Sequence, residues 1–492
     1  MLDLSRILFS KLKKHNVKYC HWKSNMNLLD ELEGGELDLY IKNESKNKFE
    51  HLIKSLGFIK AFDPMQNHVK DVYHFYGIDK DTGKILHLHV FYKILTGESL
   101  IKNLKFEIGD LLLKDTSHIS EVIIPNAQVE LIIFIIRIFS KHQSIIEYLL
   151  LLRNYNNIKK ELLDIENRIV GRKNLENFLK KYFNDLPLDI IEDSINSIKL
   201  NKNFFYKYLL AKRFNKYLKK NARYNNFTSF YLRNILFLKY VYRKIFLKKK
   251  TKVLFKNGFV CAIAGPDATG KSTMVKTLSD TLAENFKVEK YHLGKPKTSF
   301  LTLPFNLVSP IIKIIFSGKR NSQVVKKNDY GLQNNSGLIQ SISAVVLAYD
   351  RLKLSRNIFK KAKHGSIVIC DRWPSKKIGA MDSPRIRCLK SYGIKNKIVS
   401  ILKKIEQDIY HKIEHPNLII QLTVPVEIAI ERNNFRNKKN KEDNKYVAER
   451  HDEKYLPDYS EFNFILLDTS CSLKESISNI KYKFWQGMRS LK

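Results

Sequence analysis

The most informative segment of the chain is a glycine-containing run that ends in a lysine and a hydroxyl residue, Gly265-Pro266-Asp267-Ala268-Thr269-Gly270-Lys271-Ser272. It fills every fixed position of the pattern G-x-x-x-x-G-K-[ST]. Glycine lets the backbone approach phosphate oxygens, and the N–H groups of the loop and of the following helix N-terminus face an anion. We expect Lys271 to reach the β- and γ-phosphates and the Ser272 hydroxyl to bind Mg²⁺. The segment therefore predicts nucleotide binding.

The residues on either side of this loop supply the local structure that the motif requires. Residues 259–264 are apolar and predict a short buried strand, and residues 273–285 carry apolar side chains at helical spacing. The expected cofactors are ATP and Mg²⁺. The predicted cofactor-binding residues are Gly265, Gly270, Lys271, Ser272 and Thr273.

Further charged residues follow expected strands later in the chain. Residues 366–371 form an apolar run that ends in Asp371, and Arg372 comes next. At the carboxyl end of a parallel strand, Asp371 can orient Mg²⁺ or polarise an acceptor, and Arg372 can hold an acceptor phosphate. A helix containing Arg432 leads to Arg436 and a charged stretch at 437–444, which predicts a lid over the donor. A solvated strand end and a basic surface loop are the simpler alternatives.

The amino-acid composition argues against several classes of protein. The 492 residues carry a formal net charge of +38, and the five cysteines are scattered without a CxxC pair. This cysteine pattern argues for a reducing compartment and against a disulfide framework or structural zinc. The N-terminus lacks the features of a signal peptide, and the longest apolar run, 131–136, is too short to span a membrane. We expect a cytoplasmic protein, with peripheral binding at the inner membrane face as an open alternative.

The pattern of helix and strand signals divides the chain into three regions. Residues 1–120 mix helix and strand, residues 121–257 look helical and strongly basic, and residues 258–492 alternate strand and helix as a parallel α/β sheet requires. The predicted fold class is therefore α/β, with an α+β N-terminal domain and a helical middle region. A homodimer is a further open expectation.

The middle region has an unusual charge pattern. No Asp or Glu occurs between Ser194 and Pro266, whereas Lys and Arg alternate with many aromatic residues. Three interpretations remain open, in decreasing order of preference. They are a helical linker with a solvated basic face, contact with an anionic membrane surface over 195–257, and nucleic-acid binding without a recognised module.

Residues 258–492 resemble the thymidylate kinase family of P-loop nucleoside monophosphate kinases. The resemblance rests on GPDATGKST at 265–273, YDR at 349–351, CDRW at 370–373 and PNLIIQLTVPVEIAIER at 416–432, in the expected order. It implies a parallel sheet flanked by helices and an ATP-dependent phosphotransferase. It further implies that Asp267 contacts the acceptor sugar region, that Arg351 and Arg372 bind the acceptor phosphate, that Asp371 lies near magnesium, and that Arg432 and Arg436 serve the lid.

The chain departs from this family where the family reads thymine. Leu347 replaces a stacking aromatic, residues 291–296 replace an Arg-Glu-Pro-Gly segment, and residues 374–385 replace a Ser-rich segment that contains Gln. Loss of base stacking costs roughly 1–3 kcal/mol per base. We therefore predict a nucleotide or another small phosphorylated or sugar-like acceptor other than dTMP. The Asp-Ser-Pro-Arg run at 382–385 resembles thymidylate-kinase-like proteins of bacterial surface-polysaccharide gene clusters.

Residues 15–150 resemble uncharacterised proteins with a minimal nucleotidyltransferase fold. That fold places an acid-x-acid pair on one strand and a third acid on a neighbouring strand, where the carboxylates hold metal ions. Here Glu36 and Asp38 supply the pair, and the third position falls on His87. A polar strand with surface acids is the simpler interpretation. Two functions therefore compete with the kinase: a nucleotidyltransferase using the acidic pair, and a nucleotide-gated scaffold at a membrane surface.

Overall fold

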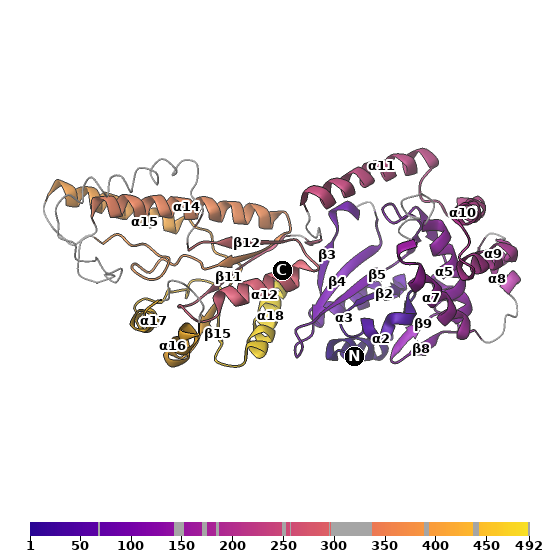
Figure 1. The fold of residues 1–492 in the computed structure, drawn as a ribbon, viewed down its shortest axis with the longest axis horizontal. Helices are drawn as coiled ribbons and strands as arrows, with labels where there is room; N and C mark the ends of the chain where they lie inside the picture. The colour runs from indigo at the N-terminus through magenta and orange to yellow at the C-terminus, as the bar shows by residue number, and fades with distance from the viewer. Residues whose placement is uncertain are drawn as a thin grey trace. The chain divides into compact units, whose positions relative to one another are not determined.

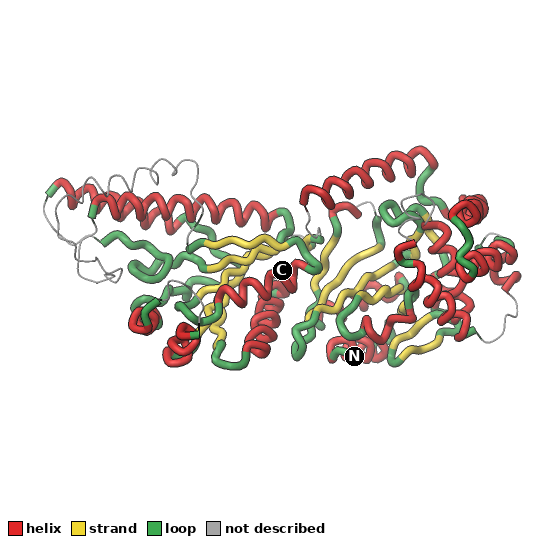
Figure 2. Tube along the Cα trace, viewed as in Figure 1, coloured by secondary structure: helices red, strands yellow, loops and turns green. Residues whose placement is uncertain are grey.

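The protein is represented by a computed structural model that describes residues 1–66, 69–141, 152–169, 175–183, 186–247, 252–255, 257–294, 296, 337–387, 393–435 and 442–490. The chain forms two compact units, Met1–Lys252 and Val253–Lys492. Each unit combines strands with helices (Figure 1; Figure 2).

A mixed sheet with the strand order β1-β2-β5-β4-β3 lies in the N-terminal unit. Its strands are β1 (Tyr19–His21), β2 (Glu36–Ile41), β3 (Ile59–Phe62), β4 (Val72–Ile78) and β5 (Ile85–Phe91). The pair β2 and β5 is parallel, and the other neighbours are antiparallel. Two hairpins are β6 (Ile94–Thr96) with β7 (Leu104–Phe106), and β8 (Ser117–Ile119) with β9 (Val122–Ile124). Helices α1 (Asp3–Lys14), α2 (Leu28–Glu31), α3 (Lys46–Ser55) and α4 (Gly109–Leu112) complete this part.

A group of helices follows the sheet and belongs to the same unit. They are α5 (Ala127–Lys141), α7 (Tyr155–Asn167), α8 (Leu175–Tyr182), α9 (Leu188–Lys199), α10 (Phe204–Leu218) and α11 (Asn226–Tyr242), with a π-helical turn at Arg243–Leu247. Short 3-10 turns lie at Asn25–Asn27, Asn43–Ser45, Pro64–Gln66 and Lys219–Asn221.

These helices share a core with the sheet, which changes the expected domain organisation. Trp22 and Phe91 of the sheet region lie in one apolar cluster with Ile132 of α5 and Phe214 of α10. The boundary that the sequence predicts at residue 120 therefore does not separate two cores, because the helices bury their apolar faces against the first region. The second expected boundary, between 257 and 258, lies close to the division after Lys252.

The C-terminal unit is built on a parallel sheet with the order β12-β13-β11-β14-β15. Its strands are β11 (Phe259–Ala264), β12 (Val288–His292), β13 (Ile367–Asp371), β14 (Leu418–Thr423) and β15 (Phe464–Asp468), and β10 (Val253–Leu254) precedes them. Strands β11 and β13 match the apolar runs at 259–264 and 366–371 that the sequence predicts. Continuous apolar runs are expected in strands that are covered on both faces, and all six residues of β11 are buried.

Helices cover both faces of this sheet. The described helices of this unit are α12 (Lys271–Ala283), α14 (Leu338–Lys363), α15 (Ile394–His411), α16 (Val426–Asn434), α17 (Asn444–Arg450) and α18 (Leu473–Arg489). Figure 1 shows α14 and α15 on one side of the sheet and α12 and α18 on the other. Alternate residues of β11 pack against the helices on opposite faces of the sheet. Val260 and Ala262 pack in a core with Ala348 of α14, while the ring of Phe259 contacts Phe484 of α18 edge to face.

Two further expectations from the sequence concern membrane-spanning helices and the charged lid. Among the described residues, no helix combines the length and the apolar character needed to cross a membrane. Arg436 and most of the predicted charged lid, residues 436–441, lie outside the described residues.

Candidate functional site

The glycine-containing loop joins the central strand β11 to helix α12. Gly265 has a φ of +138°, Ala268 a φ of +66° and Gly270 a φ of +87°, so three positions of the loop adopt the positive-φ backbone that favours glycine. A Cβ on Gly265 would lie 2.5 Å from the carbonyl oxygen of Leu422, which explains why glycine is needed there. The helix begins at Lys271, immediately after the loop. Its free N–H groups and the positive end of its dipole therefore face the interior of the loop.

Lys271 lies against the loop that precedes it. Its Nζ donates to the carbonyl oxygen of Pro266 at 2.5 Å and lies 3.9 Å from Oδ1 of Asp267. The side chain is buried, whereas Ser272 and Thr273 are exposed in the first turn of α12. This places an ammonium group inside the curve of the loop and hydroxyl groups at its rim, as phosphate and Mg²⁺ binding would require.

The acid and arginine predicted after the neighbouring strand lie beside this loop. Asp371 ends β13 and is opposite Ile263 of β11, and the Arg372 N–H donates to the Ile263 carbonyl at 2.9 Å. The Arg372 guanidinium is 3.2 Å from Oδ1 of Asp267. The structure thus brings together Lys271, Asp371 and Arg372 at the carboxyl edge of the sheet, where ligands bind in open α/β folds.

Asp371 has a carboxylate oxygen suited to a metal ion. Its Oδ2 lies 3.3 Å from Nδ1 of His292, while Oδ1 is buried and makes no hydrogen bond with any described residue. A buried carboxylate oxygen without a partner is costly, and Mg²⁺ prefers oxygen ligands. Together with the Ser272 hydroxyl, this residue fits the requirements of an Mg²⁺ ion at the nucleotide phosphates.

Arg351 is not placed as the sequence predicts. The expectation was direct contact with an acceptor phosphate, but the side chain is completely buried in α14. Its five N–H groups donate to the carbonyls of Leu293, Gly294 and Asp382, to the Tyr410 hydroxyl and to Oδ1 of Asp382. Because no N–H group is left for a ligand, Arg351 holds the segment after β12 against residue 382.

Asp382 connects the buried Arg351 to the partly buried Arg372. One carboxylate oxygen is 2.9 Å from Arg351 and the other is 3.2 Å from Arg372. Burial acts to raise the pKa of Asp382, but the charges of Arg351 and Arg372 outweigh it, and the pKa is lowered. The carboxylate is therefore charged and fixes the direction of the Arg372 side chain.

Two residues that sequence reasoning missed also reach the loop. Arg450 ends α17, and its Nε lies 3.5 Å from Oδ2 of Asp267. His451 Nε2 lies 2.9 Å from the Asp267 carbonyl oxygen and donates to it. Burial raises the pKa of Asp267, but Lys271, Arg372 and Arg450 together lower it. The sequence signal for these two residues was a basic pair, Arg450-His451, that lies six residues after the end of the expected lid at 444.

Arg432 contacts the loop after β15. Its guanidinium donates to the carbonyl and hydroxyl oxygens of Thr469. The Thr469 hydroxyl in turn donates to the Thr269 carbonyl at 3.1 Å. Arg432 is therefore linked to the phosphate-binding loop through Thr469, and its expected role in a lid stays a prediction, as does that of Arg436.

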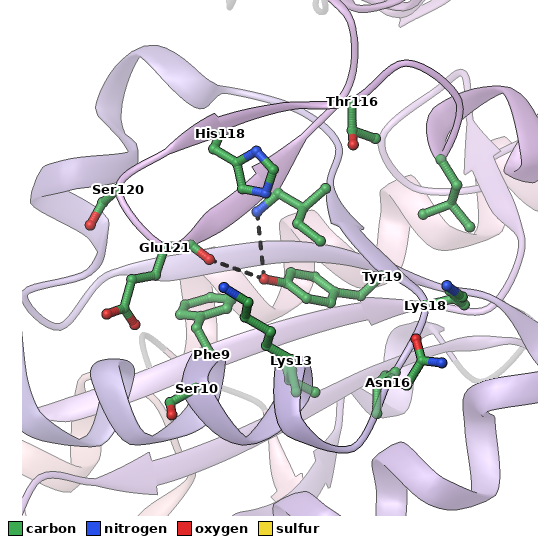
Figure 3. A pocket seen from close by; sticks show the side chains of 14 residues that line it. Phe9, Ser10, Lys13, Asn16, Lys18, Tyr19, Thr116, His118, Ser120 and Glu121 are labelled. Carbon is green, nitrogen blue, oxygen red and sulfur yellow. Dashed lines mark hydrogen bonds between the residues drawn. The ribbon is translucent and has the colours of Figure 1, made fainter.

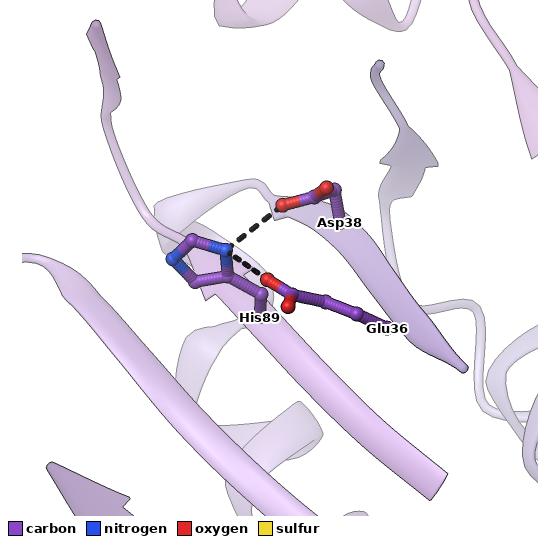
Figure 4. Close-up of side chains that lie close together, drawn as sticks. All are labelled: Glu36, Asp38 and His89. Carbon is purple, nitrogen blue, oxygen red and sulfur yellow. Dashed lines mark ion pairs between the residues drawn. The ribbon is translucent and has the colours of Figure 1, made fainter. Parts of the chain in front are cut away.

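A second cluster lies on the sheet of the N-terminal unit (Figure 4). Glu36 and Asp38 of β2 lie beside His89 of β5, and Asp38 pairs with His89 in the parallel register. The third position that the sequence assigns to His87 therefore belongs to His89. His87 is opposite Glu36 instead, with its Nδ1 3.3 Å from Oε2 of that residue.

Charged and aromatic groups surround this cluster. Lys23 Nζ is 2.7 Å from Oδ1 of Asp38, and burial lowers the pKa of the nearby Lys102 to about 7. Burial also lowers the pKa of His87 to about 4, although Glu36 acts to raise it. The His87 imidazole beside Glu36 is therefore neutral at neutral pH.

A cavity of about 560 Å³ lies elsewhere in the N-terminal unit (Figure 3). Tyr19 lies within it, with its hydroxyl 3.4 Å from the Glu121 carbonyl oxygen and 3.5 Å from the Ile123 nitrogen. Lys13 and His118 also line it. None of the residues predicted to form a site lines this cavity.

Comparison with known proteins finds one curated protein, in two strains, that is similar to part of the chain. No family model matches the chain. A stretch of 179 residues is 26% identical to the uncharacterized ATP-binding protein YghR of Escherichia coli K12, covering 35% of this chain and 67% of that protein. The same protein of Escherichia coli O6:H1 strain CFT073 gives the same values.

Two of the solved structures that match part of the chain are described here. Thymidylate kinase from Candida albicans has 13% identity and a TM-score of 0.28, covering 47% of this chain and 90% of its own. Deoxyadenosine kinase from M. mycoides with bound dATP has 15% identity and a TM-score of 0.26. The match covers 46% of this chain and 98% of that kinase. The resemblance of the N-terminal region to nucleotidyltransferases stays a prediction.

The loop geometry predicts the effect of a methyl group at Gly265. We expect Gly265→Ala to weaken nucleotide binding by about tenfold or more, because the Cβ would press on the Leu422 carbonyl at a positive φ. Gly393→Ala is the matched control, since Gly393 has a φ of +129° but open space around its Cβ position. Calorimetric titration with ATP would compare the two variants, and equal loss of affinity in both would contradict the steric explanation.

The ion pairs of Asp382 with Arg351 and Arg372 predict that removing its charge lowers the stability of the C-terminal unit. Asp382→Asn leaves a buried guanidinium without its counter-charge and is expected to destabilise the C-terminal unit by about 3–5 kcal/mol. Asp280→Asn is the control, because Asp280 forms an exposed pair with Lys290 and should cost about 0–1 kcal/mol. Denaturant unfolding followed by tryptophan fluorescence measures the free energy of unfolding of both variants. A similar loss of stability in the two would contradict a stabilising role for the contacts of Asp382 with Arg351 and Arg372.

Proposed function

We propose that residues 258–492 form an ATP- and Mg²⁺-dependent phosphotransferase of the nucleoside monophosphate kinase type. The observation that supports this most directly is the placement of Lys271 and the N-terminus of α12 around one loop. Asp371 and Arg372 lie on the adjacent strand at the same edge of the sheet. Phosphoryl transfer depends mainly on positioning and on neutralising charge, and these residue types serve both purposes.

Each residue has a role in this proposal. Main-chain N–H groups of the loop and Lys271 bind the β- and γ-phosphates of the donor, while Ser272 and Asp371 hold the metal ion. Bound Mg²⁺ would neutralise phosphate charge in the transition state. Arg372 and Arg450 add positive charge beside the loop, and both lie next to Asp267. An anionic acceptor can replace Asp267 as the partner of these arginines.

The acceptor is proposed to be a nucleotide or another phosphorylated or sugar-like molecule rather than dTMP. Leu347 of α14 is half-buried at the position where the resemblance places a stacking aromatic. An aliphatic side chain cannot supply the stacking of about 1–3 kcal/mol per base that thymine would need. The run at 382–385 resembles thymidylate-kinase-like proteins of bacterial surface-polysaccharide gene clusters, which supports a link to surface-polysaccharide biosynthesis.

Transfer of phosphate from labelled ATP tests this function. Across a panel of nucleoside monophosphates, sugar phosphates and dTMP, Lys271→Ala should lower transfer by about 100-fold, as loss of one transition-state donor does. Lys276→Ala provides the control, since Lys276 is exposed on the same helix and should keep full activity. Equal turnover and equal ATP affinity in Lys271→Ala and the unmodified protein would refute the kinase proposal.

A membrane surface is proposed as a partner of the N-terminal unit. Helix α11 exposes Phe227, Phe230 and Tyr231, with 79%, 64% and 57% of their surface accessible. Lys239 and Lys244 are also exposed nearby, and the segment contains no acid. Aromatic and basic side chains together suit the headgroup region of an anionic bilayer.

Vesicle flotation tests this partner. The protein should float with phosphatidylserine vesicles but not with phosphatidylcholine vesicles, and salt should release it. The double variant Phe227→Ser/Phe230→Ser should bind about tenfold more weakly or worse. Leu29→Ser, which changes another exposed apolar residue, should bind normally. Association with DNA and none with anionic vesicles would contradict the proposal.

A further inference from the structure

The cavity of the N-terminal unit combines apolar walls with basic groups and a buried hydroxyl (Figure 3). It lies where the end of α1 and the start of β1 meet the hairpin of β8 and β9. Its volume of about 560 Å³ falls within the range of about 300–1,000 Å³ that is usual for small-molecule sites. Apolar side chains form part of the lining, namely Phe9, Leu12, Val17, Leu113 and Ile123. The acid pair on β2 contributes nothing to it.

The wall formed by α1 is fixed by the way in which this helix ends. The helix stops at Lys14, Asn16 adopts a φ of +49°, and the Val17 N–H donates to the Leu12 carbonyl at 3.0 Å. Such a closing turn satisfies a carbonyl of the last helical turn and directs the chain into the next element. The backbone that carries Lys13 and the strand that carries Tyr19 are therefore joined by a defined turn.

The Tyr19 hydroxyl is a buried polar group with poor hydrogen bonding. The residue is only 2% exposed, and its hydroxyl lies 3.4 Å from the Glu121 carbonyl oxygen and 3.5 Å from the Ile123 nitrogen. Hydrogen bonds of a hydroxyl group normally measure about 2.7–3.0 Å. Because both contacts are long, a ligand oxygen at a normal distance would satisfy this hydroxyl better than its present partners do.

Basic side chains on different walls of the cavity favour an anion. Lys13 comes from α1, Lys18 precedes β1, and His118 belongs to β8. Figure 3 shows Lys13 and His118 on opposite sides of the Tyr19 hydroxyl. Glu121 is the one acidic residue in the lining. The cavity thus offers positive charge and a hydroxyl donor around one space, next to apolar surface.

We propose that this cavity binds a small organic phosphate, with its phosphate group between Lys13, Tyr19 and His118 and its organic part against the apolar walls. A phosphate monoester carries a charge of about −1.5 to −2 at pH 7 and three strong acceptor oxygens, which suits several donors better than a single carboxylate does. The volume suits a molecule of the size of a sugar phosphate or a mononucleotide. No residue of the C-terminal unit lines the cavity, so this site does not depend on the kinase proposal.

Pyridoxal phosphate is a suitable probe, because it joins a phosphate monoester to a ring with an aldehyde. The aldehyde forms an imine with a lysine amine and releases water, borohydride reduces the imine, and peptide mass analysis of the full chain locates the product. Lys13 should be labelled at least about tenfold faster than Lys14, because binding in the cavity holds the aldehyde close to it. Lys14 is the matched control, as the next residue of α1, equally exposed and outside the cavity.

Two variants test the polar groups of the cavity. Tyr19→Phe and His118→Gln should each slow the labelling of Lys13 by about tenfold, as the loss of a hydrogen bond to a charged group does. His51→Gln, at an exposed histidine outside the cavity, should leave the labelling unchanged. Melting temperatures show that the variants fold, and unchanged labelling in both cavity variants would contradict the proposal.

Protection of Lys13 by added ligands distinguishes the sources of the phosphate. Stronger protection by AMP than by ribose phosphate would support a nucleotide, and protection by ribose phosphate that is at least as strong would support a sugar phosphate. Equal labelling of Lys13 and Lys14, no protection by either ligand, or equally strong protection by inorganic phosphate would overturn the proposal. Labelling of Lys271 is measured separately in the same digest, so the kinase proposal and this one can fail independently.

Discussion

The C-terminal site depends on the buried carboxylate of Asp382, which holds two arginines at once. Arg351 is wholly enclosed and can exist as a charged group only because acceptors surround it, including both the carbonyl and the carboxylate of residue 382. The second oxygen of the same carboxylate directs Arg372 toward the phosphate-binding loop. The direction of the partly buried Arg372 side chain therefore depends on the same carboxylate that compensates the buried charge of Arg351.

Local sequence signals predicted the parts of this site that are built from neighbouring residues. The strand, loop and helix around 265–272 follow one another in the chain, so glycine positions and apolar spacing were sufficient. Strand β13 and the Asp371-Arg372 pair at its end were predicted for the same reason. In each case the side chains that matter lie within a few residues of the pattern that predicts them.

Contacts between distant segments were not predictable in this way. The sequence suggested a ligand contact for Arg351, but its burial results from the packing of α14 against residues 293–294 and 382. Arg450 approaches Asp267 only because α17 folds back to the loop. In the N-terminal unit, His87 and His89 face the same side of β5, so alternation could not tell which one faces Asp38. Only the register between two strands decides it.

The charges around the loop explain how a strongly basic chain can keep such a site ordered. Lys271, Arg372 and Arg450 would repel one another if Asp267 did not lie among them. Arg372 is further held by Asp382. The acids thus act as internal counter-charges that fix the directions of the cations before any ligand arrives, which lowers the cost of reorganisation on binding. A phosphate group carries more charge and more acceptor oxygens than the Asp267 carboxylate, so it can take over these contacts without requiring the cations to move far.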